Sequence, residues 1–262
     1  MVDICVPGGG DSKTAEVTCT GINSSGNVVG YARQVDRKQV AFFWSPTEGF
    51  TTLGTISSGS DNGNTAYAIN DLNQVTGNLI VSKGPGVILY HAYLWSPGMG
   101  EPRDLGALDG PTDSSSGIAI NNLTQVVGTS GSNGIGEPMK WQKRSGMKLL
   151  GMVPGALYAE AEGVNDTGQI MGLDQTGESD RGFYIAPGVG LRLLNGLGGK
   201  SAVAEAINQN GLMVGYADDA NRDDHAVRWM SYTSVPEIIP GADNALGVNN
   251  LGQVVGAAYF PK

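Results

Sequence analysis

A twelve-residue pattern that recurs six times along the chain constrains the fold more than any other feature. Each copy combines small residues, a central asparagine and a closing Val-Val-Gly or a close variant of it. The central asparagines are spaced 47, 51, 44, 43 and 41 residues apart, and a period of about 20 to 50 residues is typical of solenoids and propellers. The copies are CTGINSSGNVVG from Cys19, AYAINDLNQVTG from Ala66, GIAINNLTQVVG from Gly117, AEGVNDTGQIMG from Ala161, AEAINQNGLMVG from Ala204 and ALGVNNLGQVVG from Ala245.

Each copy predicts a β-hairpin. The asparagine begins the turn because its side chain bonds to the backbone two residues on, and a residue in the left-handed region closes it three positions later. The apolar pair that follows, such as Val28 and Val29, starts the return strand. The closing residues are Gly26, Asn73, Gly168, Gly211 and Gly252, with Thr124 as the one departure.

Two further apolar segments follow each of the first five hairpins, and the first of them contains every tryptophan of the chain. Four strands in roughly 44 residues match one propeller blade. Glycine supplies 41 of 262 residues, which indicates frequent turns and little helix. The tryptophans are Trp44, Trp95, Trp141 and Trp229, and Ile185 takes their position in the fourth copy.

The two ends of the chain suggest how the repeats close. VDICVPGGGDS near the N-terminus aligns with RDLGALDGPTDS, which places the last strand of a unit first. Pairing such a strand with the C-terminal hairpin removes free sheet edges. We therefore predict an all-β fold: a six-bladed β-propeller forming one domain over 1–262, with blade 6 built from 243–262 plus 1–12. A five-bladed ring is the alternative, because only AYFPK remains for the third strand of the sixth copy.

The repeats resemble the HAF repeat of bacterial proteins described as probable extracellular repeat proteins. The resemblance rests on A-x-A-I-N-x-x-G-Q-V-V-G, H-A-F-L-W and D-L-G-x-L-G-G, and it covers essentially the whole chain. Its best copies are Ala66 to Gly77 with His91 to Trp95, and Ala204 to Gly215 with His225 to Trp229. It implies a secreted or cell-surface protein and brings no catalytic residues. The histidine survives only as His91 and His225, and the fourth copy lacks the tryptophan.

Charge excludes several classes of partner. With 25 acidic and 16 basic residues the formal charge is −9, which opposes binding to nucleic acid or to an anionic bilayer. No apolar stretch is long enough to insert into a membrane, and MVDICVPGGG has no signal-peptide pattern. We expect a monomer. Cys5 falls on an outer strand and Cys19 on an inner one, too far apart for a disulfide, so both thiols are expected to be free and buried.

The residue three positions before each central asparagine supplies the sharpest binding prediction. Tyr67, Glu162 and Glu205 hold this position in the second, fourth and fifth copies. If these strands line the axis, Glu162 and Glu205 come from neighbouring blades and either share a proton or bind a cation. The alternative is that both carboxylates end in solvent at the channel mouth.

A second candidate site is an acidic loop in the fifth repeat. Asp218, Asp219, Asp223 and Asp224 could bind calcium through oxygen ligands, although the spacing is not that of an EF-hand loop and solvated charge is the alternative. His91 and His225 occupy the same position in two repeats, and a shared structural hydrogen bond explains them better than a metal does.

The function indicated by these observations is a non-enzymatic, lectin-like extracellular binding module for a glycan or a protein on one propeller face. Loops of differing length and composition favour one asymmetric site over six identical ones. Two alternatives remain: a propeller hydrolase or lyase with an axial carboxylate pair or metal site, and a purely structural surface protein. The tyrosines that would serve as platforms, if exposed, are Tyr67, Tyr90, Tyr158, Tyr216 and Tyr232.

Overall fold

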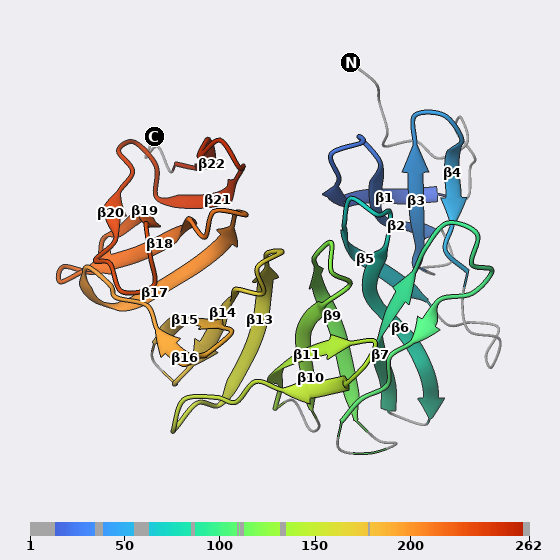
Figure 1. Ribbon diagram of the computed structural model, residues 1–262, viewed down its shortest axis with the longest axis horizontal. Coiled ribbons are helices and arrows are strands. Elements are labelled where there is room, and N and C mark those ends of the chain that lie inside the picture. Colours follow the sequence, from blue (N-terminus) through green and yellow to red (C-terminus); the bar gives the residue numbers. More distant parts are fainter. Residues whose placement is uncertain are drawn as a thin grey trace. The chain divides into compact units, whose positions relative to one another are not determined.

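The computed structural model describes residues 14–34, 39–54, 63–84, 87–108, 110, 113–131, 135–177 and 179–258. Every regular element in these ranges is a β-strand, which confirms the all-β prediction (Figure 1). Most strands come from the predicted repeat, since each central asparagine falls in the turn between the first two strands of a unit.

The first three repeats each form a four-stranded sheet whose strands follow in chain order. The first sheet contains β1 (Thr14–Ile22), β2 (Val28–Gln34), β3 (Gln39–Ser45) and β4 (Gly49–Thr52). The second contains β5 (Asn64–Ile69), β6 (Val75–Gly84), β7 (Val87–Trp95) and β8 (Arg103–Asp104). The third contains β9 (Ser114–Ile120), β10 (Val126–Gly131), β11 (Glu137–Gln142) and β12 (Gly146–Leu149).

The fourth and fifth repeats also have four strands each, and a single parallel bridge between Arg181 and Ala202 joins them into one sheet. The fourth repeat contains β13 (Tyr158–Val164), β14 (Ile170–Gln175), β15 (Asp180–Ala186) and β16 (Val189–Leu193). The fifth contains β17 (Gly198–Ile207), β18 (Met213–Asp219), β19 (Asp224–Trp229) and β20 (Glu237–Ile238). The sixth repeat forms only the pair β21 (Asn244–Val248) and β22 (Val254–Ala257).

The chain divides into two compact units. The first unit comprises Met1–Asn133 with Trp141–Lys148, and the second comprises Gly134–Lys140 with Leu149–Lys262. Residues 1–12, the expected closing segment, lie outside the described residues. The single domain, the six-bladed closure and its five-bladed alternative therefore stay predictions.

A β-bulge interrupts the first hairpin of every repeat at the same place. The register shifts between Ala161 and Gly163 opposite Gly172 and Met171, and equivalent shifts occur in the other five hairpins. The extra residue of each bulge is the one three positions before the central asparagine. Such bulges redirect a side chain and increase the local twist.

The glycine that ends each Val-Val-Gly segment is required by the same bulge. A Cβ on Gly215 would lie 2.0 Å from the carbonyl oxygen of Val203, and one on Gly77 would lie 1.9 Å from that of Thr65. Neither glycine has a positive φ, so the reason is close backbone approach rather than conformational freedom.

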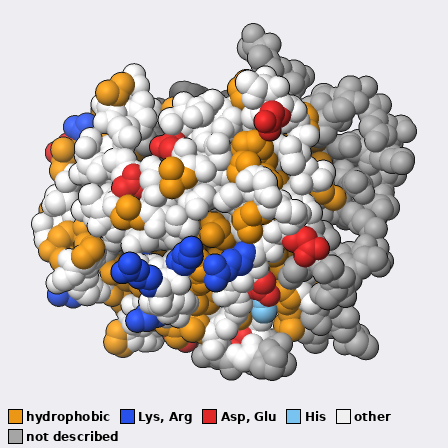
Figure 2. Space-filling model, turned by 45° about the vertical axis from the view of Figure 1, so that its right-hand side comes forward, with side chains coloured by type: hydrophobic (Ala, Val, Ile, Leu, Met, Phe, Trp, Pro, Cys, Tyr) orange, Lys and Arg blue, Asp and Glu red, His pale blue; other side chains and the backbone are white. Residues whose placement is uncertain are grey.

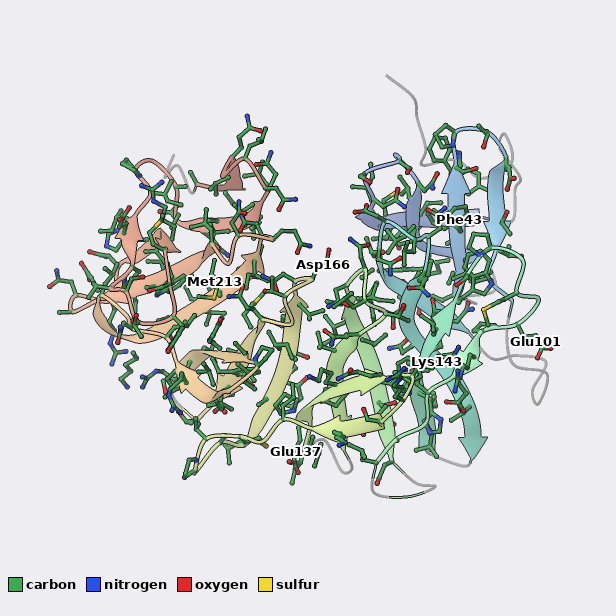
Figure 3. The ribbon with its side chains drawn as sticks, in the orientation of Figure 1. Phe43, Glu101, Glu137, Lys143, Asp166 and Met213 are labelled. Atoms are coloured by element: carbon green, nitrogen blue, oxygen red, sulfur yellow. The ribbon has the colours of Figure 1, made fainter. Side chains whose placement is uncertain are left out.

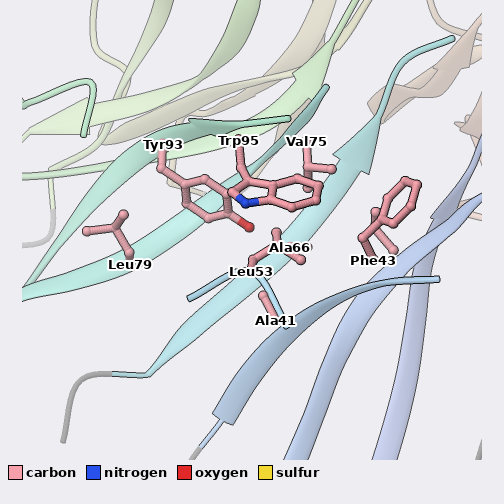
Figure 4. Close-up of a cluster of buried hydrophobic side chains, with 9 residues drawn as sticks. Ala41, Phe43, Leu53, Ala66, Val75, Leu79, Tyr93 and Trp95 are labelled. Atoms are coloured by element: carbon pink, nitrogen blue, oxygen red, sulfur yellow. The ribbon is translucent and has the colours of Figure 1, made fainter. Parts of the chain in front are cut away.

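Apolar residues of neighbouring sheets pack together within each unit. In the first unit, Phe43 of β3 lies 5.7 Å from Trp95 of β7 between ring centroids, and Leu53 and Ala66 are fully buried in the same cluster (Figure 4). In the second unit, Met171 of the fourth repeat packs with Met213 and Trp229 of the fifth. Figure 3 shows Phe43 and Met213 among the packed side chains of their own units.

The predicted burial of Cys19 is wrong. Its equivalents Ala66, Ala161 and Ala204 are buried, whereas Cys19 is exposed on β1. Ala66 is covered because it belongs to a cluster that contains residues of the preceding sheet, and β1 belongs to the first sheet in the chain. Cys5 lies outside the described residues.

Candidate functional site

The central asparagines connect the repeats as well as stabilising the turns. The Oδ1 atom of Asn208 accepts hydrogen bonds from the backbone N–H groups of Asn210 and Leu212, at 2.9 and 3.0 Å. Its Nδ2 donates to the carbonyl of Asn249 in the next repeat, at 2.9 Å. The first pair of bonds includes the predicted turn contact, and the link between repeats was not predicted.

The same link recurs in both units. In the first unit, Asn23 donates to the carbonyl of Asn70 at 3.1 Å, and Asn70 donates to that of Asn121 at 2.8 Å. In the second unit, Asn165 donates to the carbonyl of Asn208 at 3.1 Å. The side-chain amides of these asparagines are therefore already hydrogen-bonded within the protein. The bulge residues are the better candidates for ligand contacts.

Glu162 and Glu205 are the bulge residues of neighbouring repeats in the second unit. Burial raises the pKa of Glu162 to about 8, and the charges of Glu160 and Glu205 add to this effect. Its Oε2 atom is buried and has no hydrogen-bond partner in the part of the chain that the structure describes. The structure thus brings the two predicted glutamates close enough to influence each other.

Two tyrosines flank these carboxylates. The hydroxyl of Tyr158 donates to Oε2 of Glu160 at 2.6 Å, and burial together with Glu160 and Glu162 raises the pKa of Tyr158. Burial raises the pKa of Tyr216 to about 12, with contributions from four carboxylates: Asp180, Glu205, Asp224 and Glu162. We call the set Tyr158, Glu160, Glu162, Glu205 and Tyr216 the tyrosine–carboxylate cluster. Its members come from β13, β17 and β18.

The cluster combines uncharged hydroxyls with carboxylates at a half-buried position. Such a set can accept hydrogen bonds from a sugar or from a cationic group, and Glu162 in its protonated form can donate one. Sequence comparison of the repeats identified Glu162 and Glu205. Glu160, two residues before Glu162, already makes this region acidic in the sequence, and alternation along a strand places residues 158, 160 and 162 on one face before the bulge is considered.

Tyr67 holds the same bulge position in the first unit. Its hydroxyl accepts a hydrogen bond from Nδ2 of Asn78 at 3.1 Å. Of the other predicted platforms, Tyr90 is exposed, whereas Tyr232 is half-buried and stacks on Tyr184 with ring centroids 4.8 Å apart. Tyr67 therefore has a local structural partner and is not shown to join the glutamates.

The acidic loop of the fifth repeat is a turn built like those of the central asparagines. Oδ1 of Asp219 accepts hydrogen bonds from the N–H groups of Asn221 and Asp223, and Arg222 has a φ of 70°. Asp218 accepts a hydrogen bond from the backbone of Ser201. Among the described residues, no group of three or more His, Cys, Asp or Glu side chains is arranged to hold a metal ion. The calcium prediction for Asp218, Asp219, Asp223 and Asp224 gains no geometric support.

Each histidine has an aspartate partner, but the two partners differ. Nδ1 of His91 lies 2.9 Å from Oδ1 of Asp104 on the adjacent strand β8. Nε2 of His225 lies 3.4 Å from Oδ2 of Asp219 in the preceding turn. Partial burial raises the pKa of Asp104, and hydrogen bonds from His91 and Gly106 outweigh it and lower that pKa overall. Both histidines thus have structural contacts, without the common partner that was predicted.

One buried carboxylate was not singled out from the sequence. Asp174 of β14 is fully buried, and its Oδ2 accepts a hydrogen bond from the N–H of Val153 at 3.1 Å. Burial raises its pKa, while the Val153 bond and the charge of Arg181 act in the opposite direction. A single aspartate in a strand has no sequence signal that separates it from a solvated one.

Comparison with solved structures identifies the class of fold. The chain is similar to TolB from Acinetobacter baumannii, with a TM-score of 0.55, 13% identity, and coverage of 81% of this chain and 52% of that one. It is also similar to a puromycin hydrolase, with a TM-score of 0.59, 14% identity, and coverage of 94% and 42%. A prolyl endopeptidase gives a TM-score of 0.60 at 9% identity, covering 85% and 34%.

These similarities show a β-propeller fold and nothing finer. The chain spans about half or less of the length of these three proteins. No protein family and no curated protein matches its sequence. Within the described residues, no helix is long and apolar enough to cross a membrane.

Proposed function

We propose that this chain is a non-enzymatic binding module of the β-propeller class, acting outside the cell or at the cell surface, whose ligand is a glycan or a protein. The observation that supports it is the tyrosine–carboxylate cluster, where Oε2 of Glu162 is buried beside two further carboxylates without a partner. A ligand hydroxyl or ammonium group would supply the missing hydrogen bond. The HAF-repeat resemblance supports the location, and six blades with a monomeric state remain part of the proposal.

A sugar-binding assay on the whole chain tests the glycan form of this proposal. Thermal unfolding is measured with a panel of neutral and amino oligosaccharides. A ligand at a hundred times its Kd adds about 2.7 kcal/mol, which raises the midpoint by several degrees. We expect such a rise in the wild type and its loss in the E162Q/E205Q double variant.

Glu48→Gln is the matched control, because Glu48 is an exposed carboxylate of the first unit. If the control and the double variant lose binding equally, the cluster is not the site. If no sugar shifts the midpoint, the glycan form is rejected, and the protein form is tested by the same variants against a purified partner.

A second candidate function is cleavage of a glycosidic bond, either by hydrolysis, as in a hydrolase, or by elimination, as in a lyase. The raised pKa of Glu162 favours it, since a carboxyl group that stays protonated near neutral pH can act as a general acid. Release of reducing ends from an oligosaccharide by the wild type, and not by E162Q, would replace the binding module by an enzyme. A chain that neither binds nor cleaves sugar or protein ligands would have a structural role.

A further inference from the structure

A second charged surface lies in the first unit, on the outer strands of the second and third repeats. Residues 140–148, KWQKRSGMK, contain four cations and no carboxylate in a chain whose net charge is −9. Lys143 and Arg144 form the turn after β11, and Lys148 lies on β12. All three are exposed. Figure 2 shows Lys and Arg side chains gathered on one face of the molecule, and Figure 3 places Lys143 just beyond β11.

Arg103 of β8 extends this surface from the neighbouring repeat. Its guanidinium carbon lies 5.4 Å from the centre of the Trp141 ring, within the range of a cation–π contact. Trp141 is only 4% exposed, whereas Arg103 is exposed, so the contact holds the Arg103 guanidinium against a buried ring. A guanidinium held in this way loses little further freedom when it binds an anion.

None of these cations is paired with a carboxylate. In the ranges that the structure describes, none of Arg103, Lys143, Arg144 and Lys148 forms an ion pair, whereas Arg33 and Arg228 pair with Glu16 and Glu237. Asp104, the neighbour of Arg103, bonds to His91 instead. The four cations are therefore available to an anionic ligand.

We propose that this surface, Arg103, Lys143, Arg144 and Lys148, binds an anionic polysaccharide through its sulfate or carboxylate groups. It involves other residues than the tyrosine–carboxylate cluster and does not depend on the function proposed for that cluster. The cations are distributed over β8, the turn after β11 and β12. A polymer with repeated anionic groups can contact several of them at once.

One feature favours a polysaccharide over a single-stranded nucleic acid. Single-stranded nucleic acid is bound by stacking its bases on exposed aromatic rings, and Trp141, the one aromatic residue of the segment 137–149, is buried under Arg103. Binding to duplex DNA is compared directly in the test below.

Binding of the whole chain to soluble polysaccharides tests this proposal. Titrations use dextran sulfate as the sulfated probe, polygalacturonate as the carboxylated probe and dextran as the neutral one, at low and at high salt. We expect dextran sulfate or polygalacturonate to bind at low salt, binding to weaken steeply as salt rises, and dextran not to bind. Comparing the first two distinguishes sulfate from carboxylate.

The decisive variant is K143Q/R144Q, for which we expect affinity to fall by about tenfold or more. Arg192→Gln is the control, because Arg192 is an exposed cation of the second unit. It should bind within about twofold of the wild type, and both variants should keep the wild-type thermal midpoint, since the replaced side chains make no ion pair.

Three results would overturn the proposal: no binding of either anionic polysaccharide by the wild type, equal losses in K143Q/R144Q and Arg192→Gln, or tighter binding to duplex DNA or anionic lipid vesicles than to both polysaccharides. A separate Arg103→Gln variant that weakens binding supports the inclusion of β8 in the surface, and one that binds like the wild type removes it.

Discussion

Protonation of Glu162 is linked to folding, because burial raises the pKa of its carboxyl group. Its pKa is about 8 in the folded chain, above the ordinary value of 4.5. When the pKa of a carboxyl group is higher in the folded state than in the unfolded state, ionisation of the group opposes folding. The stability is therefore greatest below the unfolded-state pKa and is lost as the pH rises through the folded-state pKa. We expect the free energy of unfolding to fall by a few kcal/mol between about pH 5 and pH 9, as measured by urea denaturation at several pH values.

The Glu162→Gln variant isolates this effect. Glutamine stays neutral, so the variant should lose most of the decline with pH and be more stable than the wild type near pH 9. Glu48→Gln should keep the wild-type decline, because Glu48 is exposed. A decline that is equally steep in Glu162→Gln would mean that another group causes it.

At the residue scale, the sequence predicted which side chains form the site but not their surroundings. Aligning the repeats placed Glu162 and Glu205 in equivalent positions of neighbouring repeats, and the structure brings their charges together. The lack of a hydrogen-bond partner for Oε2 of Glu162 was not predictable. It depends on the direction in which the bulge turns the side chain, and the residue pattern does not determine that direction.

The hairpin turn is the element on which the repeat depends. In Asn208→Ala the turn loses the acceptor for two backbone N–H groups and the bond to the carbonyl of Asn249. We expect a loss of about 1–3 kcal/mol in the free energy of unfolding, measured in urea. Asn221→Ala, at an exposed position in the turn between β18 and β19, should change it by less than about 0.5 kcal/mol.

The second strand of each hairpin tolerates no side chain at its glycine. The Gly215→Ala substitution would place a Cβ 2.0 Å from the Val203 carbonyl, between two strands that cannot separate without breaking their pairing. We expect a loss of about 2 kcal/mol or more, or failure to fold. Gly190→Ala is the control, since its nearest neighbour would be the end of the Arg192 side chain at 3.8 Å. Equal stability of the two variants would contradict this account of the glycine.

The hairpins were predictable because turn chemistry is local. Even Thr124, the one closing residue that departs from the pattern, has a φ of 58°, and its hydroxyl donates to Gln74 at 2.7 Å. The bonds between repeats were not predictable from one copy, since the asparagine that begins a turn looks the same whether or not its amide reaches the next repeat.

At the scale of the whole molecule, the repeat period predicted the propeller fold and left its closure open. Four strands in each of five repeats follow from local hairpins and their spacing. Closure depends instead on pairing between residues far apart in the chain, and it rests on two short terminal segments with weak patterns. For the same reason the division into two compact units had no sequence signal.

The excess of acidic residues suggests that a bound cation could stabilise the whole chain. The hydrogen bonds in the turn that contains Asp219 argue against such a cation. A metal stabilises a fold only if the native state binds it better than the unfolded chain does. Asp219 bonds to two backbone N–H groups and lies near His225, and the described residues contain no group of three or more His, Cys, Asp or Glu side chains arranged to hold a metal ion. We expect the thermal midpoint to be the same in EDTA and in calcium. A fall in EDTA that calcium restores, and that disappears in a D219N/D223N variant, would instead establish the acidic loop as a calcium site.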